Sequence, residues 1–243
     1  MCIFDMVVGG AHRTLRALTA TLFPEHCLLT GILLQSQASY APGIDDAALL
    51  FHQPAPRSVE IELLIQRHVH ADDLMISSFI SLWGISATST IDNAVYAVKY
   101  SGRTRLAVAL GGVLAEHPAM NSIDRSTIVC PLPIHRARKR ERGYNQAERI
   151  AVGLCERTGL AMLPEGVIVR TRYRESQTTL SDVERRANVA GIFSVAKPEM
   201  VRDQRILLID DVLTTGSTLN SCATALIEAG ARRVDVATLC VAV

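Results

Sequence analysis

Short, continuous runs of apolar residues recur through the second half of the chain, and segments with helical spacing separate them. Runs of this kind are typical of strands that are covered on both faces, as in a parallel sheet. The strands are predicted at residues 127–130, 167–170, 192–195, 205–210 and 234–241. Because strands alternate with helices, the fold class is predicted to be α/β, with a mostly parallel sheet flanked by helices.

Apolar positions at helical spacing predict the helices between these strands. The spacing holds at Ile91, Val95 and Val98, and again over residues 106–114, on either side of a Ser-Gly break. A further helix is expected at 145–158, stopped by Gly159. The remaining signals are a capping box at Ser181 and Glu184, which opens a helix through about residue 189, and Gly230, which ends the last helix.

The first 90 residues are patterned differently and predict a separate, smaller part of the chain. Short helices are expected at 13–23 and 60–68, with a proline-containing linker at 38–57. Residues 74–91 carry no charge over 18 positions, the length at which a membrane helix must be considered. Seven of these positions are Ser or Thr, so we expect a buried or partner-facing segment, no membrane span and a soluble protein.

Charge is distributed unevenly although the formal net charge is only +1. Residues 1–90 hold four Arg against eight acidic residues, and the remainder holds 21 basic against 16 acidic residues. Positive charge therefore lies in the α/β part, where an anionic ligand would be attracted. The six cysteines show no pairing rhythm, and the N-terminus is a poor signal peptide, so a reducing cytoplasm is the expected location.

Residues 205–219, RILLIDDVLTTGSTL, carry the most informative chemistry. An apolar strand delivers Asp210 and Asp211 to its carboxyl end, where open α/β sheets bind ligands. A run of small residues then precedes a helix, so that a phosphate would meet unpaired N–H groups, hydroxyls and the positive end of the helix dipole. A pair of acids beside one phosphate loop suits a ribose 5-phosphate. The loop residues are Thr214, Thr215, Gly216, Ser217 and Thr218.

Two other interpretations of this segment compete with that one. A P-loop also joins strand, phosphate loop and helix, but it needs a lysine, and none occurs from residue 210 to the end of the chain. That interpretation fails. The other is an ordinary turn between strand and helix, in which the acids are solvated and Ser217 is a plain N-cap.

The segment ILLIDDVLTTGST closely resembles the phosphoribosyl pyrophosphate (PRPP) motif of type I phosphoribosyltransferases. Three further blocks resemble the ComF family, named for a competence protein, in its order and approximate spacing: KYSGR at 99–103, CPLPIHRARKRERGYNQAERIA at 130–151, and SQTTLSDVERRANVAGIF at 176–193. The resemblance covers about residues 92–243. It implies a type I phosphoribosyltransferase-like domain at 91–243 behind a module, or hood, at 1–90.

This resemblance implies a role for each part of PRPP. The 5-phosphate belongs at residues 214–218, and Asp210 and Asp211 belong on the ribose hydroxyls as the catalytic pair, directly or through Mg²⁺. Mg²⁺ keeps several waters and relies on substrate oxygens, so no all-protein metal cage is expected. The expected ligand is PRPP or ribose 5-phosphate, and the expected activity is transfer of a phosphoribosyl group to an acceptor that the sequence does not identify.

A basic segment is expected to meet the pyrophosphate. It follows the strand at 127–130 as a loop, and only Glu141 opposes its cations, which are Arg136, Arg138, Lys139, Arg140 and Arg142. Guanidinium groups bind phosphate oxygens in a bidentate way. The alternatives are a solvated loop and contact with a nucleic-acid backbone. The family name implies DNA uptake, so single-stranded DNA and DNA-uptake proteins are alternative partners.

Residues 172–180 match the mobile loop of the family. Such a lid would exclude water from the reacting C1 centre, and its candidate side chains are Arg172, Arg174 and Gln177; the alternative is an exposed crossover loop. Lys99, Tyr100 and Arg103 match the family at the edge of the domain, where they either reach the site or join the helices. The oligomeric state stays open.

The N-terminal module resembles a degenerate form of the zinc module of the family. A CLLCG-like block of the family reads CLLTG at residues 27–31, and no cysteine follows Cys27 until Cys130. A structural zinc site needs four Cys or His ligands. His26, His52, His68 and His70 are the other candidates nearby, and His68 and His70 are spaced for a strand or loop and not for a helical clamp. We therefore expect no bound zinc.

Overall fold

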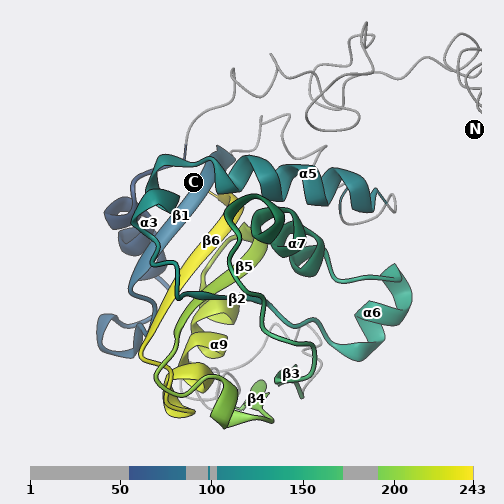
Figure 1. Ribbon diagram of the computed structural model, residues 1–243. Coiled ribbons are helices and arrows are strands. Elements are labelled where there is room, and N and C mark those ends of the chain that lie inside the picture. The colour runs from purple at the N-terminus through teal and green to yellow at the C-terminus, as the bar shows by residue number, and fades with distance from the viewer. Residues whose placement is uncertain (1–54, 86–97, 99–102, 172–190, 243) are drawn as a thin grey trace, which may run out of the picture. The chain divides into compact units, whose positions relative to one another are not determined.

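The computed structural model describes residues 55–85, 98, 103–171 and 191–242 (Figure 1). Several predicted features lie outside these residues: the helices at 13–23 and 181–189, the CLLTG block, and the helical spacing over 91–97. The predicted boundary at residues 90 and 91 also lies outside them and stays a prediction.

Four parallel strands form the main sheet, in the order β1-β6-β5-β2. The strands are β1 (Ser78–Ile85), β2 (Ile128–Pro131), β5 (Arg205–Leu213) and β6 (Arg233–Ala242). The central pair is almost wholly buried, as its continuous apolar runs predict. The predicted α/β fold class with a parallel sheet is thus confirmed, and the sheet gains an edge strand, β1, from residues that precede position 91.

Helices cover both faces of this sheet (Figure 1). On one face lie α5 (Thr104–Ala115) and α7 (Gln146–Thr158), which contact β6, β5 and β2. On the other face α3 (Ser58–Ile65) and α9 (Ser217–Glu228) share a buried apolar cluster with the strands. Because successive strand residues point to opposite faces, one continuous apolar strand such as β5 can pack against both helix layers.

Helix α7 has the bounds that the sequence predicts because both of its ends are specified locally. The side chain of Asn145 accepts a hydrogen bond from the Ala147 N–H and caps the first turn. Gly159 ends the helix in the left-handed conformation, at φ 75°. The α5 and α7 axes approach so closely that Gly111 and Gly153 face backbone carbonyl groups of the opposite helix.

The smaller elements connect these layers. A two-stranded antiparallel hairpin pairs β3 (Ile168–Arg170) with β4 (Phe193–Val195). The remaining elements are η1 (Ala71–Asp73), η2 (Pro118–Ser122), α6 (Arg136–Arg142) and η3 (Pro198–Met200). Residues 161–163 extend the sheet beyond β2 through one isolated bridge, between Val129 and Met162.

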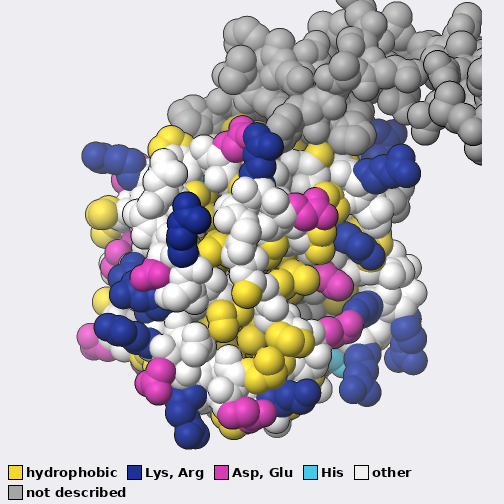
Figure 2. All heavy atoms as spheres, in the orientation of Figure 1, with side chains coloured by type: hydrophobic (Ala, Val, Ile, Leu, Met, Phe, Trp, Pro, Cys, Tyr) yellow, Lys and Arg dark blue, Asp and Glu magenta, His cyan; other side chains and the backbone are white. Residues whose placement is uncertain are grey.

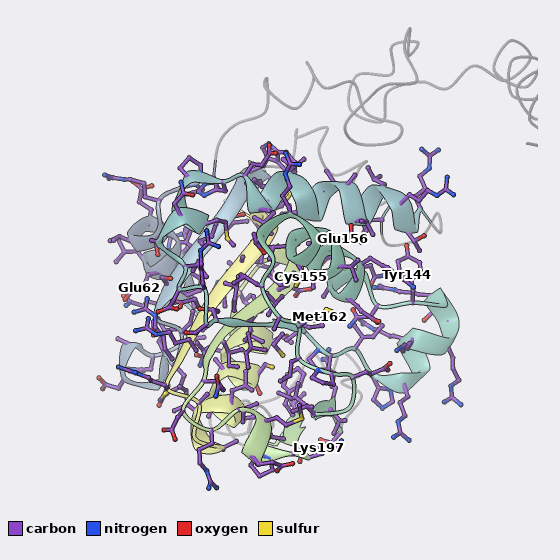
Figure 3. All side chains as sticks on the ribbon, in the orientation of Figure 1. Glu62, Tyr144, Cys155, Glu156, Met162 and Lys197 are labelled. Carbon is purple, nitrogen blue, oxygen red and sulfur yellow. The ribbon has the colours of Figure 1, made fainter. Side chains whose placement is uncertain are left out.

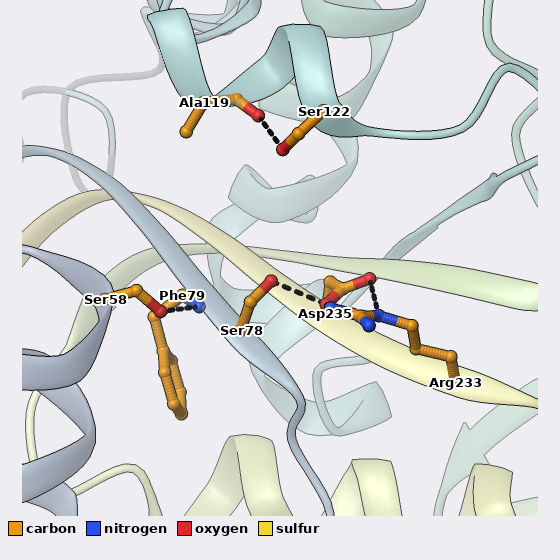
Figure 4. Close-up of polar contacts among 7 residues, drawn as sticks. All are labelled: Ser58, Ser78, Phe79, Ala119, Ser122, Arg233 and Asp235. Carbon is orange, nitrogen blue, oxygen red and sulfur yellow. Dashed lines mark hydrogen bonds and ion pairs between the residues drawn. The ribbon is translucent and has the colours of Figure 1, made fainter.

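Polar side chains tie the edge strand β1 into the sheet (Figure 4). Asp235 of β6 is 5% exposed, accepts a hydrogen bond from the Ser78 hydroxyl at 2.6 Å, and binds the guanidinium group of Arg233 at 2.8–3.0 Å. This interaction raises the pKa of Arg233. At the start of α3, the Ser58 hydroxyl accepts a hydrogen bond from the Phe79 N–H at 2.9 Å. Residues 58–85 are thereby joined to the same sheet that carries the predicted site.

Candidate functional site

Asp210 and Asp211 lie near the carboxyl end of β5, as predicted, but β5 continues to Leu213, three residues further than expected. Their side chains leave the backbone toward opposite faces because they are adjacent in a strand. Asp211 is buried, at 7% exposure, and Asp210 is half-buried. The Asp211 N–H donates a hydrogen bond to the Asp210 carboxylate at 2.9 Å, which orients that carboxylate.

Residues 214–218 join β5 to α9, and we call them the candidate phosphate loop. Thr214 and Thr215 are exposed, and α9 begins at Ser217. The N-cap residue, Gly216, has no side chain to cap α9, and the only first-turn contact described with a side chain is a long one, from the Ser217 N–H to the Thr215 hydroxyl at 3.4 Å. The first N–H groups of a helix have no partner within the helix, so they point outward together with the positive end of the dipole. The loop therefore presents the donors that an anion needs.

Helix α3 closes one side of the candidate phosphate loop, which the sequence did not predict. A Cβ atom on Gly216 would lie 2.9 Å from the side chain of Ile65, and Gly216 also has φ 72°, so both packing and conformation require glycine there. Asn220 of α9 holds the chain after α3: its side chain accepts from the Met75 N–H and donates to the Asp73 carbonyl, each at 2.8 Å.

The chain leaves β2 at the same edge of the sheet as the two acids. Pro131 pairs with Ile209, and the Leu132 N–H donates to the Ile209 carbonyl at 2.8 Å. The side chain of Asn145 then donates to the Leu132 carbonyl at 3.0 Å, which fixes this turn to the start of α7. The structure thus brings together the acids, the candidate phosphate loop and the beginning of the segment that leads to the predicted cations.

The basic segment itself is a helix, α6, and the prediction of a loop over residues 136–142 is wrong. His135 Nδ1 accepts a hydrogen bond from the Ala137 N–H at 3.2 Å, and Gly143 ends the helix at φ 79°. Arg, Lys, Glu and Ala all favour helices, so propensity offered a signal that the loop prediction disregarded. No residue of α6 is buried. Figure 2 shows Lys and Arg side chains gathered on the side of the molecule where α6 lies.

The cations of α6 are not opposed by Glu141 alone, which corrects a second expectation. The Lys139 ammonium group lies 2.5 Å from a Glu165 carboxylate oxygen and 3.8 Å from one of Glu148. Both carboxylates come from outside the helix. Arg136, Arg138 and Arg140 are exposed, and Arg142 is half-exposed. Lys139 is therefore already partnered, and an incoming phosphate would compete with Glu165 for it.

Residues 172–190 lie outside the described residues, so the lid predicted at residues 172–180, with Arg172, Arg174 and Gln177, stays a prediction. The hairpin of β3 and β4 brings the two ends of this segment together. The Thr171 hydroxyl donates to the Gly191 carbonyl at 2.8 Å, and the Thr171 N–H donates to the Ile192 carbonyl at 2.8 Å. Lys99 and Tyr100 are also outside the described residues, and Arg103 is the exposed residue that precedes α5.

The thiols near this edge are unreactive. Burial raises the pKa of Cys130 to about 12, and burial, assisted by the nearby Cys130 and by the charge of Asp210, raises the pKa of Cys222 well above its ordinary value. Both thiols stay protonated at neutral pH and cannot serve as nucleophiles.

Over the described residues, no group of three or more His, Cys, Asp or Glu side chains is placed to hold a metal ion. In the same part of the chain, no helix could span a membrane.

The site lies in a segment of the chain that matches a known protein family. Residues 140–242 match the family model described as phosphoribosyl transferase domain. This match covers α7, the hairpin, both central strands and α9, and it contains Asp210, Asp211 and the candidate phosphate loop. The chain therefore carries a phosphoribosyl transferase domain.

The relatives are proteins of competence and DNA utilization. Competence protein F of Haemophilus influenzae is 34% identical over 110 residues, which cover 44% of this chain and 47% of that protein. DNA utilization protein YhgH of Salmonella typhimurium is 29% identical over 157 residues, or 63% of this chain and 68% of that protein. Competence protein ComFC of Bacillus subtilis is 29% identical over 107 residues, or 44% and 41%. The chain is a distant homologue of these proteins, and its match spans about half the length of competence protein F.

Among solved structures, the chain is similar to glutamine PRPP amidotransferase from B. subtilis, complexed with ADP and GMP. The two are 23% identical, with a TM-score of 0.41, over 59% of this chain and 30% of that chain.

Proposed function

We propose that this protein binds PRPP or ribose 5-phosphate with Mg²⁺ at the carboxyl edge of the sheet, and that it transfers the phosphoribosyl group to an acceptor. The observation that carries the proposal is the placement of two adjacent acids and a helix start with a glycine N-cap at the end of one central strand, inside the matched domain. An acidic pair and an anion site at this spacing fit the two ends of a ribose phosphate.

Each part of the ligand has a partner in this proposal. The 5-phosphate binds the N–H groups and hydroxyls of the candidate phosphate loop, and Asp210 and Asp211 bind the ribose hydroxyls. Mg²⁺ would be held by PRPP oxygens together with one of these carboxylates, and it would neutralise the pyrophosphate charge. Arg136, the first cation after β2, would hold the leaving pyrophosphate.

The reaction needs no nucleophile from the protein. The bond from C1 to the pyrophosphate oxygen breaks, the acceptor forms a bond to C1, and the electron pair leaves with pyrophosphate. Groups of fixed positive charge stabilise such a leaving anion without rearranging during the reaction. Residues 172–180 would cover the centre and keep out water, which otherwise competes with the acceptor.

Adding PRPP and Mg²⁺ to the full chain should raise its melting temperature. At a ligand concentration of 100 times Kd, a site present only in the folded state contributes about 2.7 kcal/mol. For a chain of this size that is a shift of roughly 5–10 °C. Scanning fluorimetry measures the shift, with pyrophosphate plus Mg²⁺ and Mg²⁺ alone as controls. A PRPP response no larger than the pyrophosphate response would overturn the proposal.

A second candidate function is contact with single-stranded DNA through α6. The supporting observation is that α6 carries five cations against one acid and buries none of its seven residues. Relatives are named for competence and DNA utilization. A solvated helix of this charge fits a phosphate backbone, because such contact needs positive charge and no deep pocket.

Replacing Arg136, Arg138 and Arg140 with glutamine should weaken this DNA contact and flatten its salt dependence. Each lost phosphate contact on a single strand lowers the slope of log K against log salt by about 0.7, so the triple variant should lose about 2 from the slope. Fluorescence anisotropy of a labelled oligonucleotide at several salt concentrations measures it. An unchanged slope would show that DNA, if bound, contacts another surface.

A further inference from the structure

A cavity of about 210 Å³ lies between α6 and the β3 strand, and its lining includes Arg136, the residue proposed above to hold the pyrophosphate. Its walls come from the end of β2, from α6, from the start of α7, from the turn at 162–166 and from β3. Asp210, Asp211 and the candidate phosphate loop do not line it. It is smaller than the 300–1,000 Å³ of typical ligand pockets, so it suits one compact ring system.

Apolar groups form part of the cavity lining, beside the polar side chains of Glu148 and Arg170. Leu163 and Ile168 are buried, and the Cys130 thiol is neutral because burial raises its pKa to about 12. The Asn145 side chain also lines the cavity, but its amide group donates to the Leu132 carbonyl and its oxygen accepts from the Ala147 N–H. The apolar part of the lining would therefore hold a ring by shape and contact, while Glu148 and Arg170 offer polar groups beside it.

Cations of α6 also line the cavity. Arg136 and Lys139 of α6 line it, and the ion pair between Lys139 and Glu165 joins α6 to the turn on the opposite wall. Met162, labelled in Figure 3, is 38% exposed and forms an apolar wall beside this pair. A ligand that fits has a flat, weakly polar ring inside and an anionic group outside.

We infer that this cavity binds one nucleotide, with the base inside and the phosphate at Arg136 and Lys139. The Glu165 carboxylate then competes with the phosphate of the nucleotide, because it forms an ion pair with the Lys139 ammonium group that the phosphate would approach. Binding exchanges one ion pair of Lys139 for another. The nucleotide is either free or part of a single strand whose other phosphates lie along α6, because both sources present the same base and phosphate.

Two pairs of matched variants test this site. Met162→Glu places a carboxylate in the wall, and Leu63→Glu places one at a 59% exposed apolar position on α3 with the same change in net charge. Binding of thymidine 5′-monophosphate and of a short oligothymidylate is followed by calorimetry. Met162→Glu should weaken binding at least tenfold, and Leu63→Glu should leave it within about twofold of the parent protein.

Glu165→Gln should tighten binding about two- to fivefold, the range expected when one partner of an exposed ion pair is removed. Glu141→Gln is its control. It also removes one negative charge, from α6, but Glu141 is not among the ion-pair partners described for Lys139. Binding of both probes identifies a nucleotide site open to either source, and binding of the oligothymidylate alone identifies the strand. Equal affinities for Met162→Glu and Leu63→Glu, or no binding of either probe by the parent protein, would overturn the inference.

Discussion

Replacing Asp210 and Asp211 together with asparagine should abolish the stabilisation by PRPP and leave the fold intact. Asparagine has nearly the same shape as aspartate, so the packing of the 7% exposed Asp211 is retained. The change removes two negative charges and replaces the charged acceptors proposed for the ribose hydroxyls with neutral amide groups. Hydrogen bonds to charged groups contribute about 1.5–3 kcal/mol each, so two of them amount to more than a hundredfold in affinity. Scanning fluorimetry and calorimetry with PRPP and Mg²⁺ measure the loss.

The control for this variant is Asp124→Asn. Asp124 is an exposed acid that precedes β2, at the end of the sheet opposite the candidate site, and its carboxylate binds Ser126. This control should lower stability slightly and retain the full response to PRPP. If the double variant keeps the response of the parent protein, the acids do not bind the ribose, and the roles proposed for this edge of the sheet are wrong.

Replacing Gly153 with alanine should destabilise the fold by about 3 kcal/mol, the upper end of the usual range for overpacking, because rigid backbone atoms cannot relieve the contact. A Cβ atom there would lie 1.8 Å from the Val108 carbonyl oxygen, and one on Gly111 would lie 2.0 Å from the Ile150 carbonyl oxygen. Both obstacles are backbone atoms, so α5 and α7 must move apart. Urea unfolding followed by circular dichroism measures the loss.

Gly159→Ala separates this contact from backbone strain. Gly159 has φ 75°, but a Cβ atom added there would meet no other atom within 4 Å. Alanine at this position therefore costs only conformational strain, about 1 kcal/mol. A loss for Gly153→Ala no greater than that for Gly159→Ala would show that the helices adjust without cost.

The sequence predicts the elements whose ends and faces are encoded locally. Its pattern predicts helix α7 with a start at Asn145 and a stop at Gly159, and it predicts each central strand from an apolar run. It predicts β1 only as a buried segment, because serines interrupt the apolar run. The place of β1 beside β6 depends on a partner more than 150 residues away, and no local pattern encodes that pairing.

The candidate site is predictable only in part, for the same reason. Asp210 and the loop that follows are contiguous in sequence, so one strand end places them together. The packing of Ile65 on Gly216 and the pairing of Lys139 with Glu165 join distant segments. Composition alone therefore overstates the positive charge of α6 that no carboxylate neutralises. It also does not predict that α3 packs against the candidate phosphate loop.

Strand β1 protects the central strands from association with other chains. Eight of the ten residues of β6 are buried in series, and β1 pairs with most of that strand. Without β1, β6 would be an edge strand with a long row of unpaired backbone groups beside apolar side chains, which is a template for aggregation. Residues 78–85 lie outside the matched domain, yet they cover the edge of its sheet. A fragment designed to begin at residue 91 would expose β6 as an unpaired edge strand and would be prone to aggregate.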